Sequence, residues 1–259
     1  MNASQIIVVA GMAGVGKTTW IQQQLSLMNR VRSDTVLYLS PEVGNVPIDQ
    51  TRLATEFPFL KVFKNGEAAE FLKLVRSAEV TFVEQGSYLK NQSIEQILPN
   101  LNYRKVAILP VGGEDSDYHT WADEVAQGTD VDSNVIHKQL CRIPTIGEVI
   151  DENSLNELWY ELTQGAYGKV TRAKGIFDVT DGRSLYADFV AGIPSAPMIE
   201  LDLPRHLDGR PERFSGVEIL GKFDEIAFKQ TLEDCCLSAE ILTHYQKQVK
   251  QYLREEVPA

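Results

Sequence analysis

The sequence predicts an α/β protein in which a nucleotide-binding domain with a mostly parallel sheet precedes a smaller α+β domain. Three observations lead to this fold class. The apolar run Ile6–Ala10 leads directly into a glycine-rich loop that carries a lysine and two threonines. The first half of the chain then alternates short apolar runs with helical patterns, which is typical of parallel sheets. The second half contains paired β-branched runs around turn residues, which is typical of antiparallel hairpins.

The glycine-rich loop matches the phosphate-loop pattern G-x-x-x-x-G-K-[ST] at every required position. Its predicted phosphate-binding residues are Gly11, Met12, Ala13, Gly14, Val15, Gly16, Lys17, Thr18 and Thr19. The glycines can adopt positive φ, so backbone N–H groups can approach an anion at the start of the following helix. Lys17 is expected to reach the outer phosphates, and the Thr18 hydroxyl to contact Mg²⁺. The motif predicts a nucleoside phosphate site.

The rest of the first half supplies further elements of the parallel sheet. Strands are predicted at residues 35–39, 80–83 and 106–109, which are short apolar or β-branched runs. Apolar residues at i, i+3, i+4 and i+7 predict a helix over residues 71–78. Residues 40–49 contain Pro41, Gly44 and Pro47 and are expected to form a loop. A helix around Trp121 and Val125, then a strand near residues 135–136, complete this half.

Polar residues and turn formers gather between residues 142 and 154, where we place the domain boundary. The predicted domains are residues 1–145 and 146–259. One helix is expected over residues 155–162, followed by a hairpin of residues 175–179 and 185–190 around a Thr-Asp-Gly-Arg turn. Further strands are predicted at 197–201 and 216–220. Two helices, around residues 228–236 and 241–252, close the chain.

The composition and net charge of the chain indicate which binding partners are unfavourable. The 259-residue chain has a net charge of −11 and a sequence pI near 4.9, which argues against nucleic acid or an anionic membrane as a partner. No stretch is long and apolar enough to span a membrane, and the N-terminal residues lack a basic region and a cleavage site. The odd number of cysteines, three, indicates reduced thiols. We therefore expect a cytoplasmic protein.

The phosphate loop and the second half together resemble the CobW-like family of P-loop GTPases, which are proposed metal chaperones or insertases. The segment from Glu42 to Asp49 looks like the family's switch segment. Val83-Glu84-Gln85-Gly86 looks like its E-x-x-G segment, with one residue fewer before the glycine. Residues 172–192 look like the opening of the C-terminal domain, and residues 216–237 look like its closing strand and helix.

This resemblance implies roles for three acids. Glu84 is expected to hold Mg²⁺ through water or to orient the attacking water, and so joins Lys17 as a predicted catalytic residue. Glu42 and Asp49 are expected to meet Mg²⁺ or a water on the γ-phosphate. For all three, the alternative of a solvated surface acid stays open. Thr18 and these acids form the predicted magnesium set.

Two departures from the family pattern limit what the resemblance implies. The family's metal-binding motif C-x-C-C is replaced by residues 65–69, Asn-Gly-Glu-Ala-Ala, so we expect no thiolate-bound zinc or cobalt. The best match to the guanine-reading motif N-K-x-D is His137-Lys138-Gln139-Leu140. Lys138 is retained and is predicted to contact the nucleotide. Leu140 cannot accept the hydrogen bonds of guanine, so either GTP or ATP could be the ligand.

Three functions are therefore compared. The leading hypothesis is a slow, Mg²⁺-dependent nucleoside triphosphatase that uses GTP or ATP as a nucleotide-driven switch or chaperone for an unidentified client protein. The alternative is a degenerate nucleotide-binding scaffold or regulatory module without useful hydrolysis. A P-loop kinase ranks lowest, because Arg30-Val31-Arg32 comes too early and is too short for an arginine-rich lid.

Overall fold

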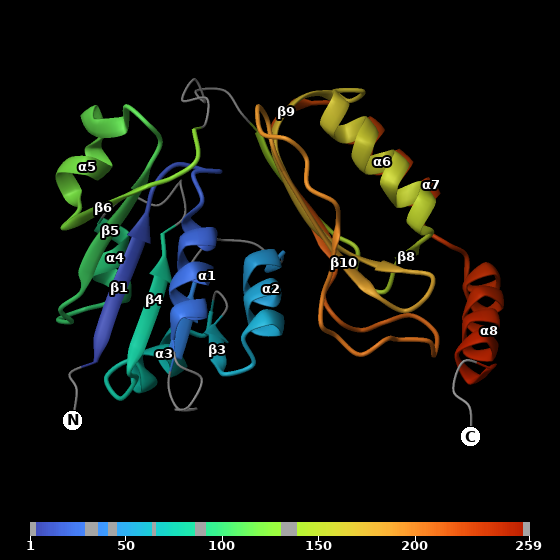
Figure 1. The fold of residues 1–259 in the computed structure, drawn as a ribbon, viewed down its shortest axis with the longest axis horizontal. Helices are drawn as coiled ribbons and strands as arrows, with labels where there is room; N and C mark the ends of the chain where they lie inside the picture. The colour runs from blue at the N-terminus through green and yellow to red at the C-terminus, as the bar shows by residue number, and fades with distance from the viewer. Residues whose placement is uncertain are drawn as a thin grey trace. The chain divides into compact units, whose positions relative to one another are not determined.

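The computed structural model of the chain divides into two compact units, Met1–Ser133 and Asn134–Ala259, each with its own sheet (Figure 1). It describes residues 4–28, 36–40, 46–63, 66–85, 92–130 and 139–255. The division falls earlier than the predicted boundary after residue 145. The reason is β7 (Gln139–Pro144), which pairs with β12 (Gly216–Phe223) and so belongs to the sheet of the second unit.

The first unit is built on a six-stranded sheet in the order β3-β2-β4-β1-β5-β6, and all its strand pairs are parallel. The strands are β1 (Gln5–Ala10), β2 (Val36–Leu39), β3 (Leu60–Phe63), β4 (Val80–Glu84), β5 (Arg104–Leu109) and β6 (Glu124–Gln127). Parallel strands place all their carboxyl ends at one edge, so β1, β4 and β6 end on the same side of the sheet. The predicted mostly parallel α/β fold is confirmed.

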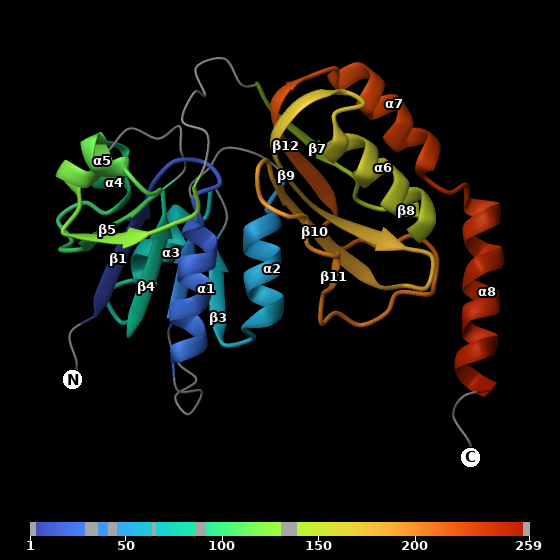
Figure 2. The ribbon, with the colours of Figure 1, turned by 45° about the horizontal axis from the view of Figure 1, so that its top comes forward.

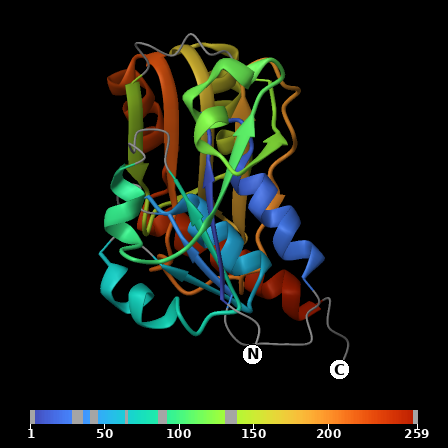
Figure 3. The same ribbon diagram turned by 90° about the vertical axis from the view of Figure 1, so that its left-hand side faces the viewer.

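Helices cover both faces of this sheet (Figure 2 and Figure 3). They are α1 (Lys17–Leu27), α2 (Ile48–Glu56), α3 (Ala68–Leu74), α4 (Gln92–Ile97), the 3₁₀ helix η1 (Gly113–Asp115) and α5 (Asp117–Trp121). Val9 of β1 packs in the same core as Ile21 of α1 and Leu53 of α2. Its neighbour Val8 packs in the opposite core with Phe71 of α3. Successive residues therefore face opposite layers, as in any strand buried on both sides.

Several element predictions need correction. The strands predicted at 80–83 and 106–109 are present, and the described part of 35–39 is β2. β3 and α2 were not predicted, because the Pro- and Gly-rich segment before them indicated only a loop. The helix expected around Trp121 and Val125 ends at Trp121, and Val125 lies in β6 instead. The strand predicted near residues 135–136 lies outside the described residues.

The second unit is an antiparallel sheet covered by helices, as the predicted α+β class requires. The strand order is β11-β10-β9-β12-β7, and the short β8 pairs with β9 in parallel. The remaining elements are β8 (Val149–Ile150), α6 (Glu152–Gln164), β9 (Gly168–Val179), β10 (Ser184–Val190), β11 (Ile199–Glu200), α7 (Glu225–Cys235) and α8 (Ala239–Glu255). The predicted hairpin is β9–β10, and the three predicted helices are α6, α7 and α8. No helix among the described residues is long and apolar enough to cross a membrane.

Apolar residues of α6 and α7 fill the core of the second unit. Leu158 of α6 and Phe228 of α7 pack in one cluster with Phe177 of β9 and Ile219 of β12. The Asp151 side chain caps α6 by accepting from the N–H groups of Asn153 and Ser154. Such a cap stabilises a helix by roughly 1 kcal/mol.

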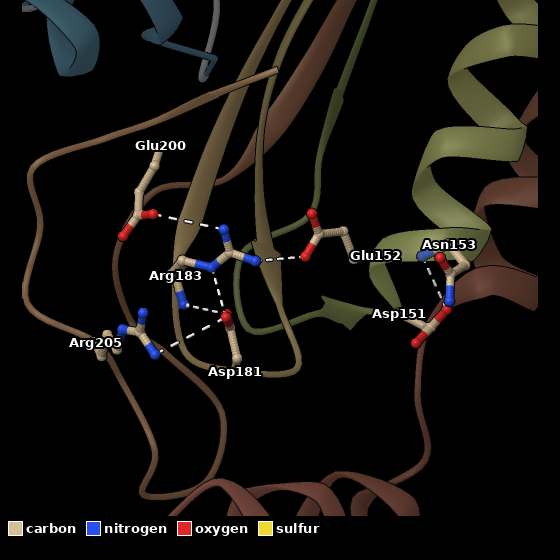
Figure 4. A network of polar contacts seen from close by, with 7 residues as sticks. All are labelled: Asp151, Glu152, Asn153, Asp181, Arg183, Glu200 and Arg205. Carbon is tan, nitrogen blue, oxygen red and sulfur yellow. Dashed lines mark hydrogen bonds and ion pairs between the residues drawn. The ribbon is translucent and has the colours of Figure 1, made fainter. Parts of the chain in front are cut away.

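An arginine-centred network ties the same end of α6 to the sheet (Figure 4). Arg183, in the β9–β10 hairpin, pairs with Asp181 of the turn, Glu152 of α6 and Glu200 of β11. Arg205 lies 3.9 Å from the Asp181 carboxylate. The carboxylates in this network are thus occupied by guanidinium groups, and we assign the network a structural role.

Candidate nucleotide-binding site

The phosphate loop, residues 11–19, connects the end of β1 to the start of α1. Gly11 has a φ of +148° and Gly16 a φ of +98°, both in the region that favours glycine. A Cβ on Gly11 would lie 2.4 Å from the carbonyl oxygen of Ile108 in β5. The loop can therefore pass this close to the neighbouring strand only without a side chain at residue 11. Gly16 caps α1, so the first N–H groups of the helix face the end of the loop.

Lys17 is the first residue of α1, and only 6% of it is exposed. Its ammonium group donates to the carbonyl oxygens of Gly11 at 3.1 Å and of Met12 at 3.0 Å. These bonds hold the positive charge at the loop, beside the positive end of the α1 dipole. A helix N-terminus and a fixed cation together form a site for phosphate.

Thr18 and Glu84 are brought together by the strand order. β4 pairs directly with β1, with Glu84 opposite Val9, so Glu84 ends its strand beside the phosphate loop. The Thr18 hydroxyl donates to the Glu84 carboxylate, with its oxygen 3.0 Å from Oε1 and 2.9 Å from Oε2. Glu84 is 7% exposed, which contradicts the alternative of a solvated surface acid. Because the hydroxyl proton points to Glu84, the lone pairs of the Thr18 oxygen can face a cation.

Tyr38 completes this cluster and was not singled out from the sequence. The Tyr38 hydroxyl donates to Oε2 of Glu84 at 2.8 Å from within the core. Burial raises the pKa of the Tyr38 phenol well above its ordinary value, and the negative charges of Glu84 and Asp49 raise it further. In the sequence, Tyr38 is recognisable only as a hydroxyl-bearing residue in a strand whose other residues are aliphatic.

Asp49 lies in the first turn of α2 and is buried. Its charge acts on Tyr38, so it belongs to the same neighbourhood as Glu84. The side-chain amide of the next residue, Gln50, donates to the carbonyl oxygen of Ser40 at 3.5 Å, which links α2 to the end of β2. Glu42, the other acid predicted for this site, lies outside the described residues.

The residues present fit magnesium. Thr18, Glu84 and Asp49 offer only oxygen atoms, which Mg²⁺ prefers, and Mg²⁺ commonly binds through one or two carboxylates together with phosphates and water. The described residues contain no group of three or more His, Cys, Asp or Glu that could hold a metal by itself. The arrangement suits a cation that arrives with phosphates.

The cysteines are placed as packing residues. Cys141 lies in β7, and burial, with the neighbouring Glu225 carboxylate, raises the pKa of its thiol to about 11. Burial also raises the pKa of the Cys236 thiol, to about 12. Zinc binds the deprotonated thiolate. The raised pKa values of Cys141 and Cys236 favour the protonated thiol, which does not bind zinc. The absence of a thiolate metal site stays a prediction.

The segment predicted to read the base is only partly described, and its described part belongs to the second unit. Gln139 and Leu140 belong to β7, in the sheet of the second unit. The last described strand of the parallel sheet before them is β6, which ends at Gln127. Lys138 and His137 lie outside the described residues, so the nucleotide contact of Lys138 stays a prediction.

A different segment lies against the phosphate loop. The segment Gln127-Gly128-Thr129-Asp130 begins at the last residue of β6, and the N–H of Thr129 donates to the carbonyl oxygen of Val15 at 2.9 Å. A Cβ on Gly128 would lie 2.3 Å from the same oxygen. This Q-G-T-D segment keeps the aspartate of N-K-x-D. The sequence patterns do not predict this segment, because they place Val125 in a helix. The Thr-Asp pair that follows a short apolar run is the pattern that could have indicated it.

Comparison with protein-family models gives no match, and neither does comparison with curated proteins. Among solved structures, the chain is similar to the Zn(II)-bound YjiA GTPase from E. coli and to a Zn(II)-bound triple mutant of YjiA GTPase. The sequence identities are 10% and 12%, and each match covers 91% of this chain and 99% of the other, with a TM-score of 0.32. These neighbours are GTPases, the class named by the CobW-like resemblance. The fold assignment rests on the strand order and loop geometry of the chain itself.

Proposed function

We propose that this chain is a CobW-like P-loop protein that binds a nucleoside triphosphate with Mg²⁺ and hydrolyses it slowly. The observation that carries the proposal is the Thr18–Glu84 hydrogen bond at the end of a phosphate loop whose lysine is already held in place. A chance glycine turn would not need a buried carboxylate 66 residues away to accept from its threonine.

Each group has a distinct task in this mechanism. The loop N–H groups and Lys17 bind the β- and γ-phosphates and stabilise charge on the transferred group. Thr18 and Glu84 would hold the Mg²⁺ that accompanies the nucleotide, with Asp49 nearby. When bound, Mg²⁺ neutralises the phosphate oxygens. Water attacks the γ-phosphorus in line while the bond from that phosphorus to the β–γ bridging oxygen breaks, which releases inorganic phosphate and the nucleoside diphosphate. Glu84 orients the attacking water, or would hold Mg²⁺ through a water. The nucleotide state then serves as a switch or chaperone signal to a client protein.

The Q-G-T-D segment bears on the choice of base. An aspartate carboxylate accepts hydrogen bonds from the amino and imino groups of guanine, whereas adenine offers it no such pair. Asp130 is exposed and follows directly on the Thr129 contact to the phosphate loop. This favours GTP over ATP. Gly128 replaces the lysine whose stem would lie along the base, so we expect a modest preference.

A nucleotide-binding scaffold is the second candidate. Both carboxylate oxygens of Glu84 accept hydrogen bonds, from Thr18 and Tyr38, an arrangement suited to holding a metal site and not to taking a proton from water. Phosphate release distinguishes the two. Turnover that disappears in Lys17→Met establishes the triphosphatase, whereas tight binding without turnover establishes the scaffold.

Calorimetry with GTP, ATP and their diphosphates, with Mg²⁺ or with EDTA, tests nucleotide binding itself. Replacing Lys17 with methionine removes a charged hydrogen-bond donor worth about 1.5–3 kcal/mol, so the affinity should fall about 10- to 150-fold. Lys105→Met is the matched control, because Lys105 pairs with Asp123 at 3.7 Å and should leave the affinity unchanged. Failure of the unaltered protein to bind any of the four nucleotides would overturn the proposal.

A further inference from the structure

Tyr38 occupies a position that apolar packing alone would fill. It lies in β2, opposite Phe82 of β4, and is 0% exposed. Its ring belongs to the same core as Ile21 of α1 and Val9 of β1. A phenylalanine would fill this space equally well and would bury no hydroxyl. A buried hydroxyl costs free energy unless it is hydrogen-bonded, so the partner of the hydroxyl is the feature to explain.

That partner is the acid of the proposed magnesium site. Glu84 stands two residues beyond Phe82 in β4, on the same face of the sheet. Two residues of strand correspond to about 6.6 Å, at about 3.3 Å each. The length of the tyrosine side chain bridges this offset, and its hydroxyl oxygen reaches Oε2 of Glu84 at 2.8 Å. The ring packs in the core while its hydroxyl reaches the site.

The hydroxyl is held in the role of a donor. A phenol keeps its proton at neutral pH, and an ionised carboxylate can only accept a hydrogen bond. Tyr38 thus donates to Glu84, which also accepts from Thr18.

We propose that Tyr38 is a positioning residue: its hydroxyl fixes the Glu84 carboxylate so that the Thr18 proton stays directed at Glu84 and the Thr18 oxygen faces the cation. This inference rests on the proposed function of the same site. Outer hydrogen-bond partners of metal ligands typically contribute 10- to 100-fold to metal affinity. Because Tyr38 acts on one of two Glu84 oxygens, we expect the lower end, about tenfold.

Tyr38→Phe tests this with two measurements on the full-length chain, using a fluorescent GTP analogue. In a Mg²⁺ titration, the half-saturating Mg²⁺ concentration should rise about tenfold. In EDTA, the dissociation constant of the analogue should stay within about twofold, because Lys17 and the loop are untouched. Tyr103→Phe is the control: Tyr103 is a part-buried tyrosine packed against the opposite core of the same unit, and neither value should change.

A double-mutant cycle tests whether the effect runs through Glu84. Tyr38→Phe should add little further change in Mg²⁺ dependence to Glu84→Gln. A Tyr38→Phe protein with an unaltered Mg²⁺ titration would overturn the inference and leave nucleotide binding intact. Equal weakening with Mg²⁺ and with EDTA would assign Tyr38 a packing role only and also overturn it. If the unaltered protein bound no analogue under either condition, the proposed function and the inference would fall together.

Discussion

Replacing Arg213 with methionine should destabilise the second unit by about 3–5 kcal/mol at neutral pH, the cost of leaving a buried charge without its partner. Asp178 of β9 is 2% exposed, and its Oδ1 lies 2.7 Å from Nε and 2.6 Å from Nη2 of Arg213. Arg213 also donates to the carbonyl oxygens of Pro204 and Gly182. The variant would leave Ser184 as the remaining Oδ1 partner among the described residues.

The loss should depend on pH in a defined direction. Burial raises the pKa of Asp178 above its ordinary 3.8, while Ser184 and Arg213 oppose that rise. A carboxyl with a raised folded-state pKa contributes stability that is complete below the unfolded pKa and is lost as pH rises through the folded pKa. Removing Arg213 raises the pKa of Asp178 further. The loss of stability in the variant should therefore be largest at neutral pH and should shrink as the pH falls and Asp178 takes up a proton.

Urea unfolding followed by the fluorescence of Trp159, a core residue of the second unit, measures this difference. Trp20 and Trp121 are replaced by phenylalanine in every protein compared. Arg210→Met is the control, because Arg210 pairs at the surface with Glu148 and should cost about 1 kcal/mol or less. Equal losses in the two variants, or an Arg213→Met loss that does not change with pH, would refute the reasoning.

Three further predictions concern the first unit and the thiols. Gly128→Ala should weaken nucleotide binding about tenfold or more in calorimetry, because its Cβ would displace the Val15 carbonyl of the phosphate loop; unchanged affinity would contradict this packing. Asp130→Asn should lower the ratio of GTP to ATP affinity, measured by competition, and an unchanged ratio would remove Asp130 from base recognition. Cys141 and Cys236 should react with a disulfide reagent at pH 8 about a hundredfold or more slowly than an exposed cysteine, because their raised pKa values lower the thiolate fraction; fast labelling of the folded protein would contradict their burial.

Local patterns predicted most elements correctly, and the failure at β6 has a structural cause. The apolar periodicity of residues 155–162 predicts α6, and the Thr-Asp-Gly-Arg turn predicts the β9–β10 hairpin. Both patterns lie within a few consecutive residues. β6 was misjudged because Val125 sits at helical spacing from Trp121 as well as in a short strand. Its four residues form a strand through pairing with β5, a contact that periodicity does not report.

The phosphate loop could be determined by the sequence alone because its requirements are local: a strand, glycines at residues with positive φ, then a lysine and a threonine. Which groups surround that loop was decided by the tertiary structure. Tyr38 meets Glu84 across 46 residues because β2 and β4 are neighbours in the sheet. Thr129 meets Val15 because β6 lies beside β5. Strand order is set by the packing of whole layers, so these contacts have no signature in any short stretch of the chain.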